Sequence, residues 1–133
     1  AFSGWLTDRV HRPTLLGSIY ILRGLSYILL LYVGLDQSML FLFAVMFGIF
    51  DYSTVPPTAS LAASRLGLPI MGLAMGLISG GHSLGGAVGA YAGGVLFDLF
   101  ARYTELWLAA FSTAIVAGLM VYFLKDGREP KAA

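Results

Sequence analysis

The sequence predicts an all-α membrane protein whose chain crosses the bilayer four times, and three observations lead to this fold class. Of its 133 residues, 58% are hydrophobic and 11% are charged, whereas a soluble domain is nearer half apolar and a quarter charged. The mean hydropathy is +0.82. The apolar residues gather in four stretches, each reaching the roughly 20 residues that a spanning helix needs. A soluble globular domain is therefore excluded.

Short polar segments separate the apolar stretches and set the expected ends of the spans. We expect membrane-spanning helices over about 14–34, 38–63, 70–97 and 106–124. Together they make a transmembrane region over 14–125, with a loop over 1–13 before it and a tail over 126–133 after it. Because the number of crossings is even, the loop and the tail are expected on the same side of the membrane.

Positive charge is distributed unevenly between the two sides. Six cationic residues fall on the side of the loop and the tail: Arg9, Arg12, Arg65, Lys125, Arg128 and Lys131. Arg102 stands alone on the other side. Cytoplasmic segments carry an excess of lysine and arginine, so both termini of this segment are expected in the cytoplasm.

The first three spans each carry an ionisable residue near the middle of the membrane. Arg23 lies ten residues after Pro13, which is about 15 Å into a hydrocarbon core about 30 Å thick. Asp51 in the second span lies about 15 Å deep, and His82 in the third about 20 Å, by the same rise per residue. A charge at mid-depth costs at least about 2.5–3.5 kcal/mol. These residues are therefore expected to face protein or water, and they are candidates for a substrate and proton pathway.

The second span combines a polar stripe with a helix-breaking pair. Asp51, Thr54 and Thr58 follow i, i+3, i+7 spacing and so share one helix face. Pro56 and Pro57 remove two backbone donors, which should bend or break the helix there. Broken transmembrane helices are tolerated where the backbone lines a cavity.

Two interpretations stay open for each ionisable residue. Arg23 and Asp51 either form a structural ion pair, or Asp51 couples protons or binds substrate while Arg23 is its partner or binds an anion. His82 either hydrogen-bonds a neighbouring helix or exchanges a proton near physiological pH.

The third span is rich in glycine, which permits close helix packing in lipid. Its glycines form two rows in which each glycine follows the last by four residues, and the two rows point to different sides of the helix. Neighbouring helices are therefore expected on both sides. The glycines assigned to packing are Gly76, Gly80, Gly81, Gly85, Gly89 and Gly93. Bulky residues of the second and fourth spans are expected to face lipid or to pack: Phe41, Phe43, Met46, Phe47 and Trp107.

Several kinds of chemistry lack a sequence signal. The chain has no cysteine and a net charge of +1, and it shows no metal, nucleotide or nucleic-acid motif, so no cofactor, metal or nucleic-acid partner is expected. The segment Gly81-His82-Ser83-Leu84-Gly85 matches the Gly-x-Ser-x-Gly nucleophile elbow. That motif needs a preceding strand and a later histidine, and this sequence offers neither. We predict that the protein is not an enzyme.

The opening segment resembles the Gly-x-Leu-x-Asp-Arg-x-Gly-Arg loop of the major facilitator superfamily. The matching residues are Gly4, Leu6, Asp8, Arg9 and Arg12, with His11 in place of the usual glycine. In that superfamily the loop follows the second helix of each half of the transporter, and its aspartate and arginines latch helix ends on the cytoplasmic face. The resemblance implies the same gating role for Gly4, Asp8, Arg9 and Arg12.

The rest of the chain fits the same resemblance. The end of the third span, Gly-Gly-Val-Leu-Phe-Asp98-x-x-x-x-Tyr103, is similar to the penultimate helix of these transporters, and a short last helix with a polar tail follows. The segment 51–57 looks most like bacterial relatives of the monocarboxylate transporters. The chain would then supply the last four of twelve helices. It begins with Ala1 in what looks like a loop, so we expect a C-terminal fragment.

The resemblance implies a secondary active transporter of the bacterial inner membrane, working by alternating access. Proton-coupled symport of a small organic anion is the expected activity, and the expected partners are lipid, the remaining helices and a small-molecule substrate. The second and third spans match helices that line the transport cavity and the first matches a peripheral one. Asp51 and His82 are therefore expected to be cavity residues, more than Arg23. The alternatives are a self-contained four-helix scaffold or a small dimeric exporter that associates through glycine-rich faces.

Overall fold

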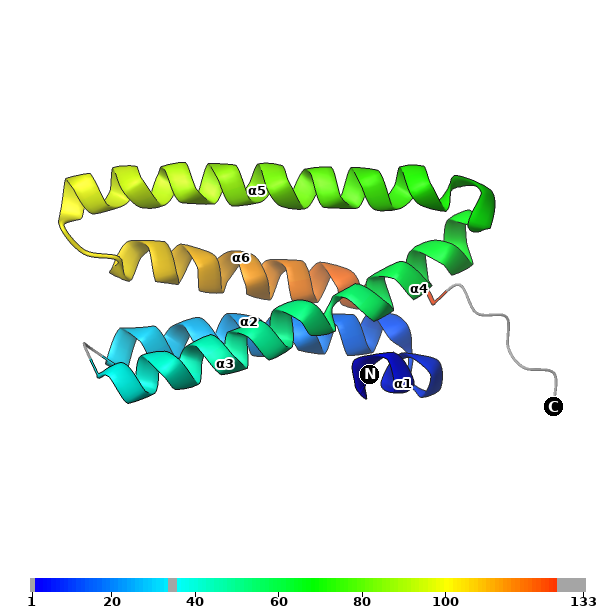
Figure 1. Cartoon of the computed structure of the whole chain (residues 1–133), viewed down its shortest axis with the longest axis horizontal. Coiled ribbons are helices and arrows are strands. Elements are labelled where there is room, and N and C mark those ends of the chain that lie inside the picture. The colour runs from blue at the N-terminus through cyan, green and yellow to red at the C-terminus, as the bar shows by residue number, and fades with distance from the viewer. Residues whose placement is uncertain (1, 34–35, 127–133) are drawn as a thin grey trace.

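The computed structural model describes residues 2–33 and 36–126, which are helical apart from short connections (Figure 1). The elements in chain order are α1 (Phe2–Arg9), α2 (Arg12–Val33), α3 (Gln37–Ser53), α4 (Val55–Leu66), the 3-10 turn η1 (Leu68–Ile70), α5 (Met71–Phe100) and α6 (Thr104–Tyr122). The predicted all-α class is confirmed. Positions 34–35 and 127–133 lie outside the described residues. They include the end of the first predicted span and most of the predicted tail, with Arg128 and Lys131.

Within the described part of the chain, four helical stretches are long and apolar enough to cross a membrane. They are Arg12–Tyr32, Gln37–Leu66, Leu68–Phe100 and Thr104–Tyr122, and they correspond in order to the four predicted spans. The expected loop over 1–13 differs, because α1 occupies most of it. This segment folds as a helix because one of its faces packs on α4, which leaves the Thr7 side chain 2% exposed.

The second span is broken where the two prolines predicted a break. Helix α3 ends at Ser53 and α4 begins at Val55, with Thr54 between them. Pro56 and Pro57 cannot donate the hydrogen bonds that would continue α3. The Thr54 hydroxyl and amide instead bond the Asp51 carbonyl at 2.7 and 3.3 Å, so the break lies beside Asp51.

The closest helix pair is α2 with α6, and glycines make that closeness possible. A Cβ placed on Gly17 would lie 2.9 Å from the Gly118 carbonyl oxygen, and one on Gly118 would lie 3.0 Å from the Gly17 carbonyl oxygen. A Cβ placed on Gly24 would lie 3.1 Å from the Ala114 Cβ. The Ser18 and Tyr122 hydroxyls join the same two helices at 2.7 Å.

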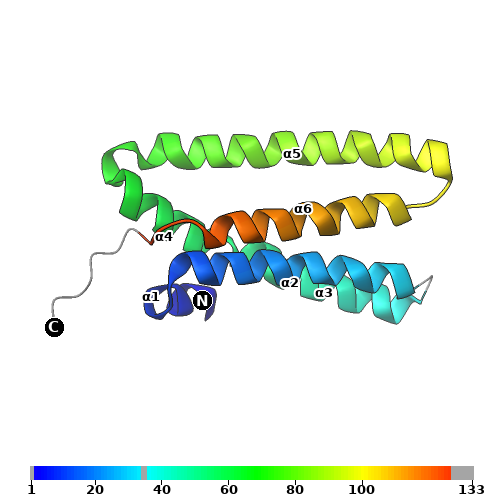
Figure 2. The same cartoon turned by 180° about the vertical axis from the view of Figure 1, so that it is seen from behind.

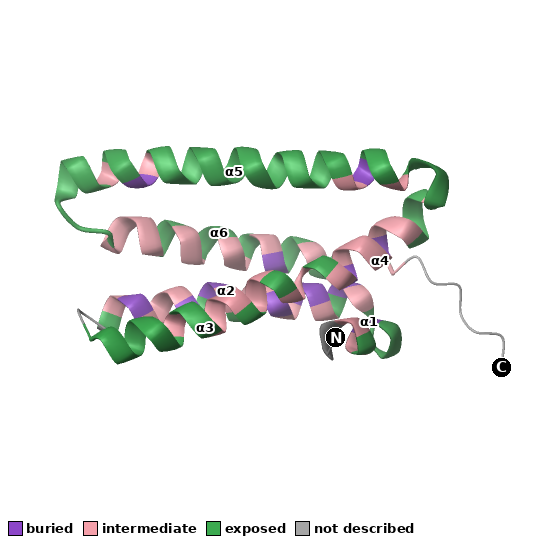
Figure 3. Cartoon of the chain, viewed as in Figure 1, coloured by how far each residue is buried: buried purple, intermediate pink, exposed green. Residues whose placement is uncertain are grey.

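Helix α5 stands apart from the other helices along most of its length (Figures 1 and 2). Its buried residues are Ala74 near one end and Gly93 near the other, and nearly all of the helix between them is exposed (Figure 3). Of the six glycines assigned to packing, Gly93 is in contact, since its Cβ would lie 3.0 Å from Leu106 Cδ2. Apart from the neighbouring residues and backbone of α5 itself, no atom of the described residues lies within 4 Å of a Cβ on the other five, so their packing stays a prediction.

Candidate functional site

The predicted pairing of Arg23 with Asp51 is present between α2 and α3. Arg23 Nη1 lies 2.8 Å from Asp51 Oδ1. Their side chains are 22% and 33% exposed, so the pair is neither on the open surface nor sealed inside the bundle. An arginine stays charged under all ordinary conditions, and the carboxylate beside it neutralises that charge at mid-span.

Aromatic rings surround the same arginine. The guanidinium carbon of Arg23 lies 4.9 Å from the centroid of the Phe47 ring, which is the geometry of a cation–π contact. The Phe47 ring contacts Tyr27 and Phe43, each at 5.5 Å between centroids. Phe43, Phe47 and Asp51 are spaced four residues apart, so one row of α3 faces one row of α2. Phe43 and Phe47, predicted to pack or to face lipid, therefore pack.

Next to the ion pair is a cavity of about 590 Å³. Nine of the twelve residues that line it carry polar or ionisable side chains. The residues that line it are Tyr20, Arg23, Asp51, Tyr52, Thr54, Val55, Thr58, Met75, Ile78, Ser79, His82 and Ser83. Its volume lies within the range of about 300–1,000 Å³ that is usual for small-molecule sites.

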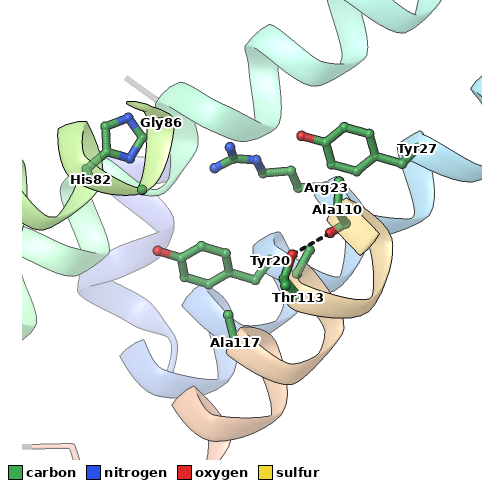
Figure 4. A pocket seen from close by; sticks show the side chains of 10 residues that line it. Tyr20, Arg23, Tyr27, His82, Gly86, Ala110, Thr113 and Ala117 are labelled. Atoms are coloured by element: carbon green, nitrogen blue, oxygen red, sulfur yellow. Dashed lines mark hydrogen bonds between the residues drawn. The ribbon is translucent and has the colours of Figure 1, made fainter. Parts of the chain in front are cut away.

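A second cavity, of about 460 Å³, lies on the other side of Arg23 between α2, α5 and α6. Its walls toward α5 and α6 are built mainly from small residues: Gly85, Gly86, Ala110, Ala114 and Ala117. Both cavities share Tyr20, Arg23 and His82. Figure 4 shows the Arg23 guanidinium reaching out from α2 toward the helix that carries His82.

At the opposite end of the helices from the α5–α6 turn, Arg12 joins three chain segments. Its Nη1 donates to the Ser60 carbonyl oxygen on α4 at 2.9 Å, and its backbone amide donates to Asp126 Oδ2 at 3.1 Å. Arg12 Nε also lies 3.9 Å from Asp126 Oδ1. Arg65 Nη2 donates to the Lys125 carbonyl oxygen, so the start of α2, the end of α4 and the segment after α6 are held together.

The comparison with known proteins agrees with this architecture. Residues 1–133 match the Major Facilitator Superfamily over the whole chain. The chain belongs to that superfamily. It is also 32% identical over 106 residues to the "Uncharacterized MFS-type transporter YcxA" of Bacillus subtilis (strain 168). That match covers 76% of this chain and 26% of the relative, so the chain spans about a quarter of the length of the relative. No solved structure matches the chain significantly.

Membership of the superfamily confirms the resemblance seen in the sequence and makes the chain part of a multi-pass membrane protein. The family is one of transporters, which fits a non-enzymatic protein. Among the described residues, no three or more His, Cys, Asp or Glu side chains are grouped to hold a metal ion.

The five residues predicted for a substrate and proton pathway lie around one cavity. These are Arg23, Asp51, Thr54, Thr58 and His82. Asp51 and His82 were expected to be cavity residues more than Arg23, because the first span resembles a peripheral helix. In the structure Arg23 lines both cavities, as His82 does. The reason is the length of its side chain, which carries the guanidinium out of α2 toward α3 and α5.

Of the four residues predicted for cytoplasmic gating, Arg12 contacts α4 and the segment after α6. Gly4, Asp8 and Arg9 lie on α1, where the Arg9 guanidinium stacks on Trp5 at 4.3 Å from the ring centroid. Two features were missed in the sequence. Asp126 was assigned to the tail, although it follows Lys125 directly and its carboxylate lies close to Arg12. Ser79 and Ser83 form a polar stripe with His82 at i, i+3, i+4 spacing, which was a usable signal.

Proposed function

We propose that this chain is the last third of a secondary active transporter, and that the larger cavity beside Arg23 and Asp51 belongs to its substrate site. The single observation that supports this best is an Arg23–Asp51 ion pair on the wall of that cavity, with His82 across it. Structural ion pairs do not need a cavity. A half-open pair of opposite charges at mid-membrane is typical of substrate and proton pathways.

The transported species proposed here is a small organic anion that moves together with a proton. While Asp51 is ionised, it satisfies the charge of Arg23. When Asp51 takes up a proton, Arg23 keeps its charge and needs another anion. A carboxylate substrate meets that need, since arginine binds planar carboxylates through paired N–H donors. Binding of the proton and binding of the anion then favour each other.

The break between α3 and α4 lies at Thr54, which lines the cavity, so the proposed site includes an interrupted stretch of helix backbone. Thr54 lies at the break and Thr58 one turn later, and each hydroxyl bonds a carbonyl of the preceding turn at 2.7 Å. Rocking of this part of the transporter against the missing helices would expose the cavity to each side in turn. The excess of arginine and lysine at the Arg12 end supports placing that end in the cytoplasm, and the bacterial source of the relative supports placing the transporter in a bacterial plasma membrane.

Superfamily membership favours transport over the two alternatives. A self-contained four-helix scaffold or a small dimeric exporter would associate through the open glycine face of α5. The relative is about four times longer than the matched segment, so helices outside this chain account for that face equally well. We therefore keep transport as the one proposed function.

The test uses the full-length transporter in proteoliposomes that contain the pH-sensitive dye pyranine. Pyruvate, lactate, succinate and benzoate are added outside in turn, and proton entry and uptake of the labelled anion are recorded. Asp51→Asn is expected to abolish proton-driven accumulation while exchange of anion across the membrane persists. Asp98→Asn, a matched change on α5 outside both cavities, should behave as the wild type. Accumulation by Asp51→Asn at the wild-type rate, or no anion-linked proton entry in the wild type, would refute the proposal.

A further inference from the structure

Phe47 lies where its ring can stabilise the positive charge of Arg23, which the ion pair with Asp51 also neutralises. It lies one helical turn before Asp51 on the same face of α3, and its ring lies beneath the Arg23 guanidinium. We propose that Phe47 is a positioning residue, which keeps Arg23 directed into the cavity during the part of the cycle when Asp51 is protonated. This inference rests on the proposed function, because it assumes that Asp51 gains and loses a proton.

The guanidinium of Arg23 has two supports of different chemistry. One is the carboxylate of Asp51 at 2.8 Å, which disappears as a charge partner once a proton binds. The other is the face of the Phe47 ring at 4.9 Å, which attracts a cation through the ring quadrupole and does not titrate. Protonation therefore removes one support and leaves the other in place.

The ring can act as a support because it is itself held. Tyr27 meets it edge-on with planes 65° apart, and Phe43 stacks on it with planes 28° apart. Tyr27 is one turn from Arg23 on α2, and Phe43 is one turn from Phe47 on α3, so both contacts belong to the same seam between the two helices. Rotation of the Phe47 side chain away from Arg23 would break both ring contacts.

Among the described residues, no other group around Asp51 can replace this support by charge. The ionisable and charged residues that face it are Arg23 and Tyr20 from α2, Tyr52 from its own helix and His82 from α5, while α4 contributes the Thr58 hydroxyl. None of these offers a negative charge to Arg23 when Asp51 is neutral. An arginine side chain is long and flexible, so without the ring it would leave the cavity wall or adopt many rotamers.

By holding the Arg23 guanidinium in place, the Phe47 ring would preorganise the binding site for the anionic substrate. A guanidinium held over the Phe47 ring leaves N–H groups that can be directed to the cavity, and two such groups can bind a carboxylate through parallel hydrogen bonds. Loss of the ring is expected to weaken anion binding by about 3- to 30-fold, the range of measured cation–π contributions. The maximal transport rate should change much less, because the ring does not contact the moving ion.

The first test measures Arg23 directly and needs no substrate. Full-length transporter is treated with phenylglyoxal, which reacts with free guanidinium groups, and modification of the Arg23 peptide is followed by mass spectrometry. In the Asp51→Asn background, Phe47→Leu should accelerate modification by about 3- to 30-fold. Phe47→Trp should restore the slow rate, because tryptophan is the strongest cation–π partner. Phe41→Leu is the control, since Phe41 is an exposed phenylalanine of the same helix.

The second test measures transport with labelled pyruvate in proteoliposomes. Phe47→Leu should raise KM by the same factor with little change in kcat, and Phe47→Trp should return KM toward the wild-type value. Equal phenylglyoxal rates for Asp51→Asn with and without Phe47→Leu would overturn the inference, even if Asp51→Asn decouples transport as proposed. Conversely, a slow rate that depends on Phe47 in a protein without proton coupling would refute the proposed function and leave the support of Arg23 by Phe47 standing.

Discussion

Replacing Gly118 by alanine is the most direct perturbation of the α2–α6 seam. A Cβ there would lie 2.9 Å from Ile21 Cγ1 and 3.0 Å from the Gly17 carbonyl oxygen. Since carbon atoms pack best at about 3.5–4.0 Å, the helices must separate by roughly 0.5 Å. A gap of that size forfeits about a quarter of the attraction at neighbouring contacts, among them Gly24 on Ala114. We expect a loss of about 1–3 kcal/mol.

The assay is thermal unfolding of full-length transporter in detergent, followed by loss of the monodisperse peak in size-exclusion chromatography. The expected loss corresponds to a fall of a few degrees in melting temperature. Gly48→Ala is the matched control, because no atom of the described residues outside its own stretch of α3 lies within 4 Å of a Cβ on Gly48. It reports the gain in helix propensity alone, which is up to about 1 kcal/mol. A melting temperature for Gly118→Ala equal to that of Gly48→Ala would refute close packing of α2 on α6.

Two further predictions concern contacts of other kinds. Gly93→Ala should lower stability by less than about 0.5 kcal/mol, because its Cβ meets the end of the flexible Leu106 side chain and not backbone. Arg12→Gln should cost about 1.5–3 kcal/mol, the value of a hydrogen bond to a charged group, since it removes the bond from Arg12 Nη1 to the Ser60 carbonyl oxygen. Both are measured by the same unfolding assay. A larger loss for Gly93→Ala than for Gly118→Ala, or an unchanged melting temperature for Arg12→Gln, would contradict them.

The candidate site shows which parts of its geometry could be predicted from the sequence and which could not. Asp51, Thr54 and Thr58 were placed on one face by helical spacing alone, and the cavity lies on that face. The presence of Arg23 and His82 at similar depth followed from counting residues along each span. That Arg23 reaches the cavity from a span with peripheral character was not predictable, since it depends on the direction of a long side chain between two helices.

By itself the sequence determined the class of protein and its four apolar helical stretches, and it predicted a break of the second span at Pro56 and Pro57 and the depth of the ionisable residues. It could do so because backbone N–H and C=O groups must be hydrogen-bonded inside a bilayer, so each apolar stretch forms a helix. Since a helix rises about 1.5 Å per residue, the position of a residue in its span gives its expected depth. Only the tertiary structure decided which helices touch. Helices α2 and α6 touch through Gly17 and Gly118, and the Arg23 guanidinium lies over the Phe47 ring. Both contacts join residues that are far apart in the sequence. No local pattern along the chain records such a pairing.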